Sequence, residues 1–191
     1  MRNPTSRLTG AKGNRKRSVV DFYPTPPEVT HALLDYIPMR DIQAIWEPAC
    51  GDYDMVNVLK ERGHKVVATD LRYGDNYLSC DVPVALAGKS FAVITNPPFN
   101  EAEAFIRRAV GESTLVFMLL KHNYFSAKTR LPLARKYPPN YVLPLTWRPN
   151  FYFKEGKGSP TMDVCWYGWD RLKGEEQIFR PLEKPIIDVA Q

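Results

Sequence analysis

The chain has 191 residues, of which 44% are hydrophobic and 25% are charged, and its formal net charge is +5. This composition predicts one soluble globular domain, and no apolar run approaches the roughly 20 residues that a membrane-spanning helix needs. The three cysteines form no CxxC pair, which argues against a structural zinc site and a disulfide framework. The N-terminal residues also lack the apolar core of a signal peptide. Both observations favour a reducing, cytoplasmic setting.

The first predicted segment, residues 1–18, is strongly basic. It holds six basic and no acidic side chains and few large apolar ones, so it predicts a flexible N-terminal arm that contacts nucleic-acid phosphates. A merely solubilising terminus is the alternative. Residues 19–191 are expected to form the single folded domain.

Helices and short apolar strands alternate over the next part of the chain. Two prolines followed by apolar residues at spacings of four predict a helix over residues 25–37. Residues 42–46 predict a short strand that ends in a loop containing proline and glycine. Residues 55–63 then predict a second helix with one apolar face and a glycine at its end.

Three more strands are predicted over residues 65–70, 91–95 and 113–120, and the last is hydrophobic enough to be central in a sheet. Residues 100–110 predict an amphipathic helix between the last two strands. Continuous apolar strands that alternate with amphipathic helices are typical of the α/β class. We therefore expect a mostly parallel, doubly wound sheet with helices on both faces.

The last third of the chain is broken by prolines and is expected to consist of loops, apart from a late strand at residues 163–169. Residues 121–158 hold eight basic and one acidic side chain, interleaved with Tyr, Trp and Phe. Cations that neutralise phosphate and rings that stack on bases are the composition expected of a nucleic-acid-facing segment. The alternative for any single ring is a place in the core.

Polar residues follow three of the predicted strands. Glu47 begins the loop after the first, Asp70 ends the second, and Asn96 follows the third. Ligands of open α/β sheets bind beyond the carboxyl ends of the strands, which predicts a site here. An acidic residue about twenty positions after the first loop can accept hydrogen bonds from both hydroxyls of a ribose, although a lone strand-end Asp is more often a helix cap.

The segment Asn96-Pro97-Pro98-Phe99 is rigid, because proline fixes its own φ and restricts the residue before it. Together with EPACGD and VVATDL at the earlier strand ends and YPTPPE upstream, it resembles the class I S-adenosylmethionine-dependent methyltransferases. The NPPF sequence is similar to that of DNA enzymes that methylate amino groups, above all adenine-N6 methyltransferases, and the short chain resembles their compact phage-type members. The resemblance covers residues 19–120 well and the remainder loosely.

The resemblance implies a Rossmann-like class I methyltransferase fold with S-adenosyl-L-methionine as cofactor and no metal. It implies nucleic acid, and most of all DNA, as the substrate, and no membrane partner. The expected setting is a bacterial or phage-infected host cell. The resemblance also implies residues that bind the cofactor. Tyr23, Pro24 and Thr25 would lie near its methionine part, Glu47, Pro48, Ala49, Cys50 and Gly51 would form the loop beneath it, Asp70 would bind the ribose hydroxyls, and Leu71 would pack on the adenine ring.

Two features of the cofactor site involve a choice or a departure from the family. A further acidic residue should meet the cofactor's adenine amino group, and Asp81 fits better than Asp75 because it lies fifteen residues before Asn96. Val82 would then stand where the family often has an aromatic residue. The departure is Tyr53, where the family usually has a second glycine. Because tyrosine does not take a positive φ cheaply, this residue puts cofactor affinity, and even activity, in question.

The resemblance also implies that Asn96, Pro97, Pro98 and Phe99 are catalytic. The exocyclic amino group of adenine is a poor nucleophile, because its lone pair is delocalised into the ring. The Asn96 side-chain oxygen and the Pro97 carbonyl would accept its two hydrogens. Phe99 would stack on the base, which must be flipped out of a duplex or come from a single strand. The expected reaction is a direct in-line methyl transfer without a covalent enzyme intermediate.

Several alternatives stay open at this point. Similar motifs occur in enzymes that methylate guanine-N2 in ribosomal RNA or glutamine in release factors, and a non-catalytic nucleic-acid-binding protein is a further alternative. The basic segment favours nucleic acid over protein. Arg148, Phe151 and Phe153 are candidates for contacts near the flipped base. Because no sizeable target-recognition insertion is present, short or relaxed specificity is expected, and the oligomeric state cannot be predicted.

Overall fold

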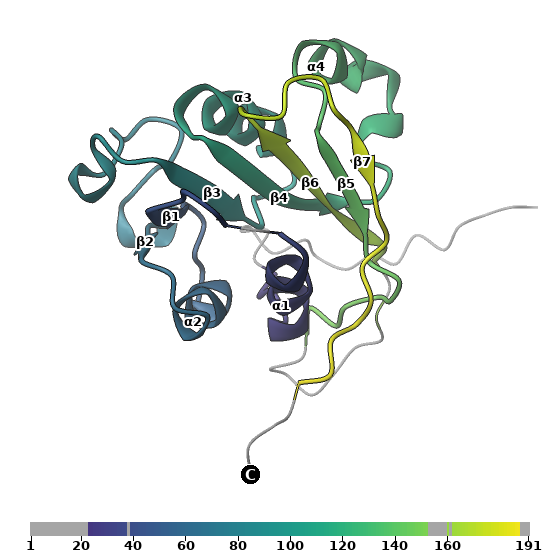
Figure 1. Ribbon diagram of the computed structural model, residues 1–191, viewed down its shortest axis with the longest axis horizontal. Coiled ribbons are helices and arrows are strands. Elements are labelled where there is room, and N and C mark those ends of the chain that lie inside the picture. Colours follow the sequence, from purple (N-terminus) through teal and green to yellow (C-terminus); the bar gives the residue numbers. More distant parts are fainter. Residues whose placement is uncertain (1–22, 38, 153–159, 161, 188–191) are drawn as a thin grey trace, which may run out of the picture.

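The structure is a computed structural model that describes residues 23–37, 39–152, 160 and 162–187. Its centre is a seven-stranded sheet with the order β2-β1-β3-β4-β6-β5-β7 (Figure 1). The strands are β1 (Ala44–Glu47), β2 (Val66–Ala68), β3 (Phe91–Thr95), β4 (Leu115–Lys121), β5 (Tyr141–Pro144), β6 (Val164–Asp170) and β7 (Ile178–Phe179). The α-helices are α1 (Pro27–Tyr36), α2 (Asp54–Glu61), α3 (Ala102–Glu112) and α4 (Leu131–Lys136).

The sheet is mixed but mostly parallel. β1 pairs in parallel with β2 and β3, and β3 pairs in parallel with β4. β6 is antiparallel to both of its neighbours, β4 and β5, and β7 is parallel to β5. The predicted α/β class is therefore confirmed, with one antiparallel strand inserted near one side of the sheet.

Helices cover both faces of the sheet, as expected for a doubly wound fold (Figure 1). On one face, α1 and α2 pack against the core through residues such as Leu33 and Leu59. On the other face, α3 and α4 do so through Ile106 and Leu133. Successive residues of a strand point to opposite faces, so all five residues of β3 are buried beneath one layer or the other.

The last third of the chain contains more regular structure than its prolines indicated. The prediction of loops is wrong for α4 and β5. Pro132 lies in the first turn of α4, where the missing N–H needs no partner, and Pro144 is the last residue of β5. Both prolines therefore stand at places that regular structure tolerates.

The carboxyl ends of the parallel strands lie at one edge of the sheet, which we call the carboxyl edge. Glu47 ends β1 there, and Asp70 and Asn96 follow β2 and β3 closely. Lys121 ends β4 at the same edge, where it is paired with Val164 at the start of β6. The three strand ends that the sequence analysis singled out therefore meet on one side of the fold.

The same topology divides the basic segment 121–158. Lys121 at the end of β4 and Arg148, shortly after β5, belong to the carboxyl edge. Arg135 and Lys136 end α4, which leads into the start of β5 at the opposite edge. There Lys136 shares a hollow with Asp170, the last residue of β6. These four described basic residues thus lie at two opposite edges of the sheet.

Candidate active site

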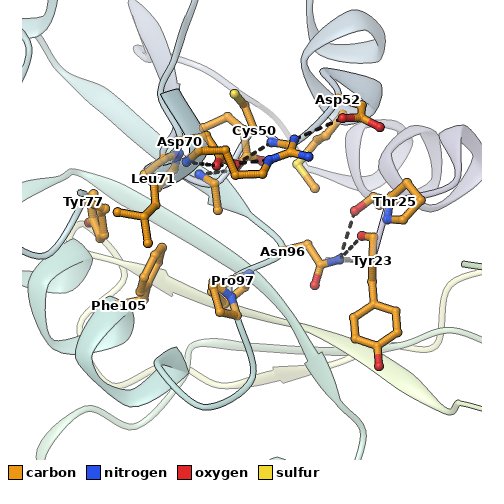
Figure 2. A pocket seen from close by; sticks show the side chains of 18 of the residues that line it. Tyr23, Thr25, Cys50, Asp52, Asp70, Leu71, Tyr77, Asn96, Pro97 and Phe105 are labelled. Atoms are coloured by element: carbon orange, nitrogen blue, oxygen red, sulfur yellow. Dashed lines mark hydrogen bonds and ion pairs between the residues drawn. The ribbon is translucent and has the colours of Figure 1, made fainter. Parts of the chain in front are cut away.

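A cavity of about 300 Å³ opens at the carboxyl edge, beyond β1, β2 and β3 (Figure 2). Ten of the predicted cofactor residues line it, namely Tyr23, Pro24, Thr25, Glu47, Pro48, Ala49, Cys50, Gly51, Asp70 and Leu71. Asn96, Pro97 and Pro98 line it as well, whereas Phe99 lies outside its walls. The structure thus brings three loops that are distant in sequence to one cavity.

Glu47 is the buried acid at the base of this cavity, with 1% of its surface exposed. Its Oε1 accepts a hydrogen bond from the Ala49 N–H at 3.0 Å. Burial raises the pKa of the Glu47 carboxyl from 4.5 to about 8, and the nearby Asp70 carboxylate acts in the same direction. Glu47 is therefore mostly neutral at pH 7, and it can release its proton when a cation arrives beside it.

Asp70 connects the loop after β2 to the loop after β1. Its Oδ2 accepts a hydrogen bond from the Gly51 N–H at 2.8 Å, and its Oδ1 accepts one from the Arg72 N–H at 2.8 Å. The side chain is well buried, and its oxygens face the cavity that Leu71 also lines. A carboxylate has about four acceptor positions, so these two bonds leave capacity for hydroxyl groups of a ligand.

Asn96 is held by the segment that precedes α1. Its amide nitrogen donates to the Tyr23 carbonyl and to the Thr25 hydroxyl, each at 3.1 Å (Figure 2). A carbonyl can only accept, so the Tyr23 contact decides which way the Asn96 amide is turned. Both amide hydrogens are used by these contacts. The Asn96 Oδ1 is left as an acceptor, and no residue in the described ranges donates to it.

Eight residues of the cavity wall were not predicted from the sequence: Asp52, Asp54, Met55, Arg72, Asn76, Tyr77, Glu101 and Phe105. Figure 2 shows Leu71, Tyr77 and Phe105 at one end of the cavity and Thr25 and Asn96 at the other. Helical periodicity marked Phe105 as inward-facing. It could not reveal that the inward direction opens onto a cavity, because that depends on where α3 sits over the sheet.

The structure does not bring Asp81 and Val82 to this cavity. They line a separate hollow, together with Arg107 and Arg108 of α3. Asp75 does not line the cavity either, whereas its neighbour Asn76 does. Between β2 and β3 the described chain forms turns and short 3-10 helices instead of a strand, so no strand end carries an acid into the site.

Tyr53 adopts the backbone conformation that a glycine would take. Its φ is 66° and its ψ is 14°, in the left-handed region, immediately before α2. Its side chain is 38% exposed and is not part of the cavity wall. The ring instead stacks on Tyr73, with 5.9 Å between the centroids. Tyr53 therefore does not fill the space in which a ligand would lie.

Aromatic rings gather around Tyr23, next to the NPPF segment. The rings of Phe99 and Tyr23 have centroids 5.5 Å apart, and the Tyr23 ring also meets the rings of Phe151 and Tyr152 at 6.2 Å. The ammonium group of Lys121 lies 5.0 Å from the centroid of the Phe99 ring. An exposed cation and an aromatic surface thus stand side by side near Asn96.

The three predicted nucleic-acid contacts differ in their surroundings. Arg148 is exposed and forms a two-point ion pair with Asp163, at 2.7 and 3.3 Å. Phe151 is only 4% exposed and belongs to the core, so its ring contacts protein. Phe153 lies outside the described residues, and so does the basic arm 1–18.

No protein-family model matches the chain, and no curated protein matches it. Solved structures do match. One is a Listeria monocytogenes protein assigned to the class I S-adenosylmethionine-dependent methyltransferases, with a TM-score of 0.53 and 13% identity, over 83% of this chain and 65% of that one. Another is a modification subunit assigned to a type I restriction enzyme of Vibrio vulnificus, with a TM-score of 0.50 and 12% identity, over 90% of this chain and 48% of that one.

The chain has the class I methyltransferase fold. At 12–13% identity this likeness shows the fold alone, and the chain spans 65% and 48% of the lengths of the two proteins. None of the helices in the described part of the chain combines the length and the apolar character that a bilayer crossing requires. The same residues contain no group of three or more His, Cys, Asp or Glu side chains placed to hold a metal ion.

Proposed function

We propose that the chain transfers the methyl group of S-adenosyl-L-methionine to the exocyclic amino group of adenine in DNA. The observation that carries this proposal is the orientation of Asn96. Its amide nitrogen is bonded to Tyr23 and Thr25, which leaves its side-chain oxygen as an acceptor next in sequence to the Pro97 carbonyl. Two fixed acceptors at one place suit an amino group, which has two hydrogens to donate.

The residues of the cavity fit the proposed cofactor. A volume of about 300 Å³ lies at the lower end of the range of small-molecule sites. Asp70 has acceptor capacity left for ribose hydroxyls, and the 65% exposed Leu71 and the buried Phe105 offer apolar surface to a purine ring. Glu47 can meet a positive charge by releasing its proton. When bound, S-adenosyl-L-methionine supplies its methyl group as an electrophile on a positively charged sulfur.

In the proposed reaction, the protein acts by positioning. Asn96 Oδ1 and the Pro97 carbonyl accept hydrogen bonds from the two amino hydrogens, which makes the nitrogen more tetrahedral and aims its lone pair at the methyl group. The nitrogen–methyl bond would form as the methyl–sulfur bond breaks, with the sulfur leaving as a neutral thioether, and the methylated nitrogen would then lose one proton to solvent. The prolines hold both acceptors in place before the base arrives, so little ordering remains at the moment of reaction. Cys50 lines the cavity, but burial raises the pKa of its thiol to about 12, so it stays protonated and is no nucleophile.

The base would approach from the side of the carboxyl edge that β4 and β5 form. Phe99 offers a ring for stacking, and the exposed Lys121 stands beside it as a cation for a phosphate. A base within a duplex must be flipped out to reach Asn96. The Vibrio vulnificus neighbour is assigned as a restriction-modification subunit, which supports DNA as the substrate class.

The experiment combines a binding titration with a product analysis. Calorimetry with S-adenosyl-L-methionine tests the cofactor. Single-stranded DNA, duplex DNA and ribosomal RNA are then treated with the protein and digested to nucleosides, and mass spectrometry identifies the methylated base. We expect N6-methyl-2′-deoxyadenosine from DNA. Methylguanosine from RNA would replace the proposed substrate, and a protein that binds no cofactor would overturn the proposed function.

The central variant is Asn96→Ala. Because Asn96 acts on the base and Asp70 on the cofactor, turnover should fall below detection while cofactor affinity stays within about twofold. Asn57→Ala, at an exposed position of α2, is the matched control and should keep full activity. Full activity in the Asn96 variant would exclude the proposed mechanism.

A further inference from the structure

Tyr53 is held in a backbone conformation that bulky residues rarely adopt. Such a conformation persists only where surrounding contacts enforce it, and residues of this kind cluster at ligand sites. Tyr53 directly precedes α2, in the loop whose residues Cys50 and Gly51 line the cavity. The question is therefore which contacts hold Tyr53, and what else those contacts hold.

The Tyr53 ring packs against the Tyr73 ring. The two rings are stacked, with centroids 5.9 Å apart and an interplanar angle of 29°. The Tyr73 hydroxyl reaches past this stack and donates a hydrogen bond to the Gly51 carbonyl at 3.0 Å. The Gly51 N–H donates to Asp70 Oδ2 at 2.8 Å. Gly51 is thus bonded at both its carbonyl and its N–H to the loop after β2.

Arg72 joins the same two loops a second time. Its guanidinium forms an ion pair with Asp52 at 3.1 Å and lies 3.4 Å from Asp70. It also lies over the Tyr73 ring, with 5.6 Å to the centroid. Tyr53, Asp52, Arg72 and Tyr73 therefore form a clasp across the rim of the cavity, between residues 50–53 and residues 70–73.

We propose that Tyr73 is a positioning residue for cofactor binding, and that the Tyr53 ring holds Tyr73 in its place. Tyr73 acts through Gly51, which in turn sets the direction of the Asp70 carboxylate in the cavity. Here the inference rests on the proposed function, because it takes the ligand to be S-adenosyl-L-methionine. A loop that is already in its bound position loses less freedom on binding, which raises affinity.

The clasp also accounts for a tyrosine at a position that suits glycine. A glycine at residue 53 would keep the path of the loop but would offer no ring to Tyr73. Tyr53 keeps the same path and adds the stacking surface, and its ring stays outside the cavity. The departure from the family pattern is thus a different way to hold the loop rather than an obstacle to the ligand.

The first test is Tyr73→Phe, which removes the hydroxyl and keeps the ring. Loss of one hydrogen bond to Gly51 should weaken the binding of S-adenosyl-L-methionine about five- to tenfold in calorimetry. The affinity for single-stranded DNA, which binds elsewhere, should stay unchanged. Tyr36→Phe, on α1 and outside the cavity, is the matched control and should bind as the wild type does. Unchanged cofactor affinity in Tyr73→Phe would overturn the inference.

The second test asks whether the two tyrosines act as a unit. Tyr53→Gly tolerates the positive φ and removes the whole side chain, so a loss of affinity reports the loss of that side chain together with the greater backbone freedom of glycine. If Tyr53 works through Tyr73, the double variant should bind about as weakly as the weaker single variant. If the fold losses of cofactor affinity in the two single variants instead multiplied in the double variant, this part of the inference would be overturned.

A third measurement needs no ligand. Amide hydrogen exchange of residues 48–56 should become at least about threefold faster in Tyr73→Phe, because the Gly51 carbonyl loses its hydrogen bond from the Tyr73 hydroxyl. Exchange elsewhere, for example over β4, should not change. Equal exchange rates in both proteins would overturn the inference. A wild type that binds no S-adenosyl-L-methionine would instead refute the proposed function, and the exchange rates would still test the clasp.

Discussion

The two halves of the carboxyl edge are built differently. On the side of β1 and β2, the polar groups at the cavity are bonded to one another before any ligand arrives, as Gly51 is to Asp70 and Asn96 to Thr25. On the side of β4 and β5, the charged groups stand in solvent. Lys121 is exposed, and the Arg148–Asp163 pair has side-chain exposures of 57% and 63%.

Under the proposed function, this difference would match two kinds of ligand. A small cofactor offers few contacts, so its site gains from groups that are fixed in advance. A nucleic acid is long and carries many phosphates, and it is bound mainly through exposed cations that displace counterions. Substitutions on the β1–β2 side should therefore act strongly and on one ligand. Those on the β4–β5 side should act weakly and in a salt-dependent way.

The largest effect is expected for Asp70→Asn, on the β1–β2 side. The substitution removes the charged acceptor for the Gly51 N–H and, in the proposed function, for the ribose hydroxyls. Cofactor affinity should fall about 100-fold, or about 3 kcal/mol, in calorimetry. Asp75→Asn, an exposed position outside the cavity, is the control and should have no effect. Equal losses in both variants would contradict the assignment of Asp70 and would point to Asp75 as a cofactor contact.

The next effect is a pH dependence of stability caused by Glu47. Its pKa is about 8 in the folded protein and near 4.5 in the unfolded chain, so between these values the folded state binds the extra proton. The stabilisation is complete below pH 4.5 and is lost as the pH rises toward 8. Urea unfolding should show a loss of about 3 kcal/mol from pH 5.5 to pH 8.

Glu47→Gln should remove this part of the pH dependence, because the amide does not titrate. The comparison is made between the two proteins at each pH, which cancels the contributions of all other groups. If both lost the same free energy of unfolding between pH 5.5 and pH 8, Glu47 would be ionised in the folded protein and the assignment of its burial would be wrong.

The smallest effect is expected for Lys121→Gln, on the β4–β5 side. Fluorescence anisotropy should show DNA affinity reduced about threefold at 0.15 M salt, with a salt slope smaller by about one. Cofactor affinity should stay the same. Lys136→Gln removes an equal charge at the opposite edge and should leave both affinities unchanged. A larger loss with Lys136→Gln would place the nucleic acid at the wrong edge for the proposed reaction.

Periodicity predicted the fold well wherever it was strong. The helices α1, α2 and α3 and the strands β1, β3, β4 and β6 lie where apolar spacing indicated them. β2 was expected to be buried but is only half-buried, because it stands at the edge of the sheet. The prediction missed α4, β5 and the two-residue strand β7. Of these, α4 and β5 contain Pro132 and Pro144, and the composition did not reveal that both prolines stand at tolerated positions.

The basic, aromatic segment shows a limit of composition as evidence. Its rings were expected to divide between a nucleic-acid surface and the core. The structure buries Tyr141 and Phe151 at about 5% exposure or less, whereas Tyr124 and Tyr152 are only partly buried. Buried and partly buried rings thus occur side by side in this segment, and composition alone does not distinguish them.

The amino-acid sequence by itself determined which groups stand at the strand ends, because apolar runs and the breaks between them are local properties. The tertiary structure decided which of those groups share a cavity. It placed Asn96 beside Thr25, 71 residues away, and left Asp81 in a separate hollow while Phe105 entered the wall. Which residues share a cavity depends on how the helices and loops pack over the sheet. A local sequence pattern does not predict this, because it contains no information on distances between remote segments.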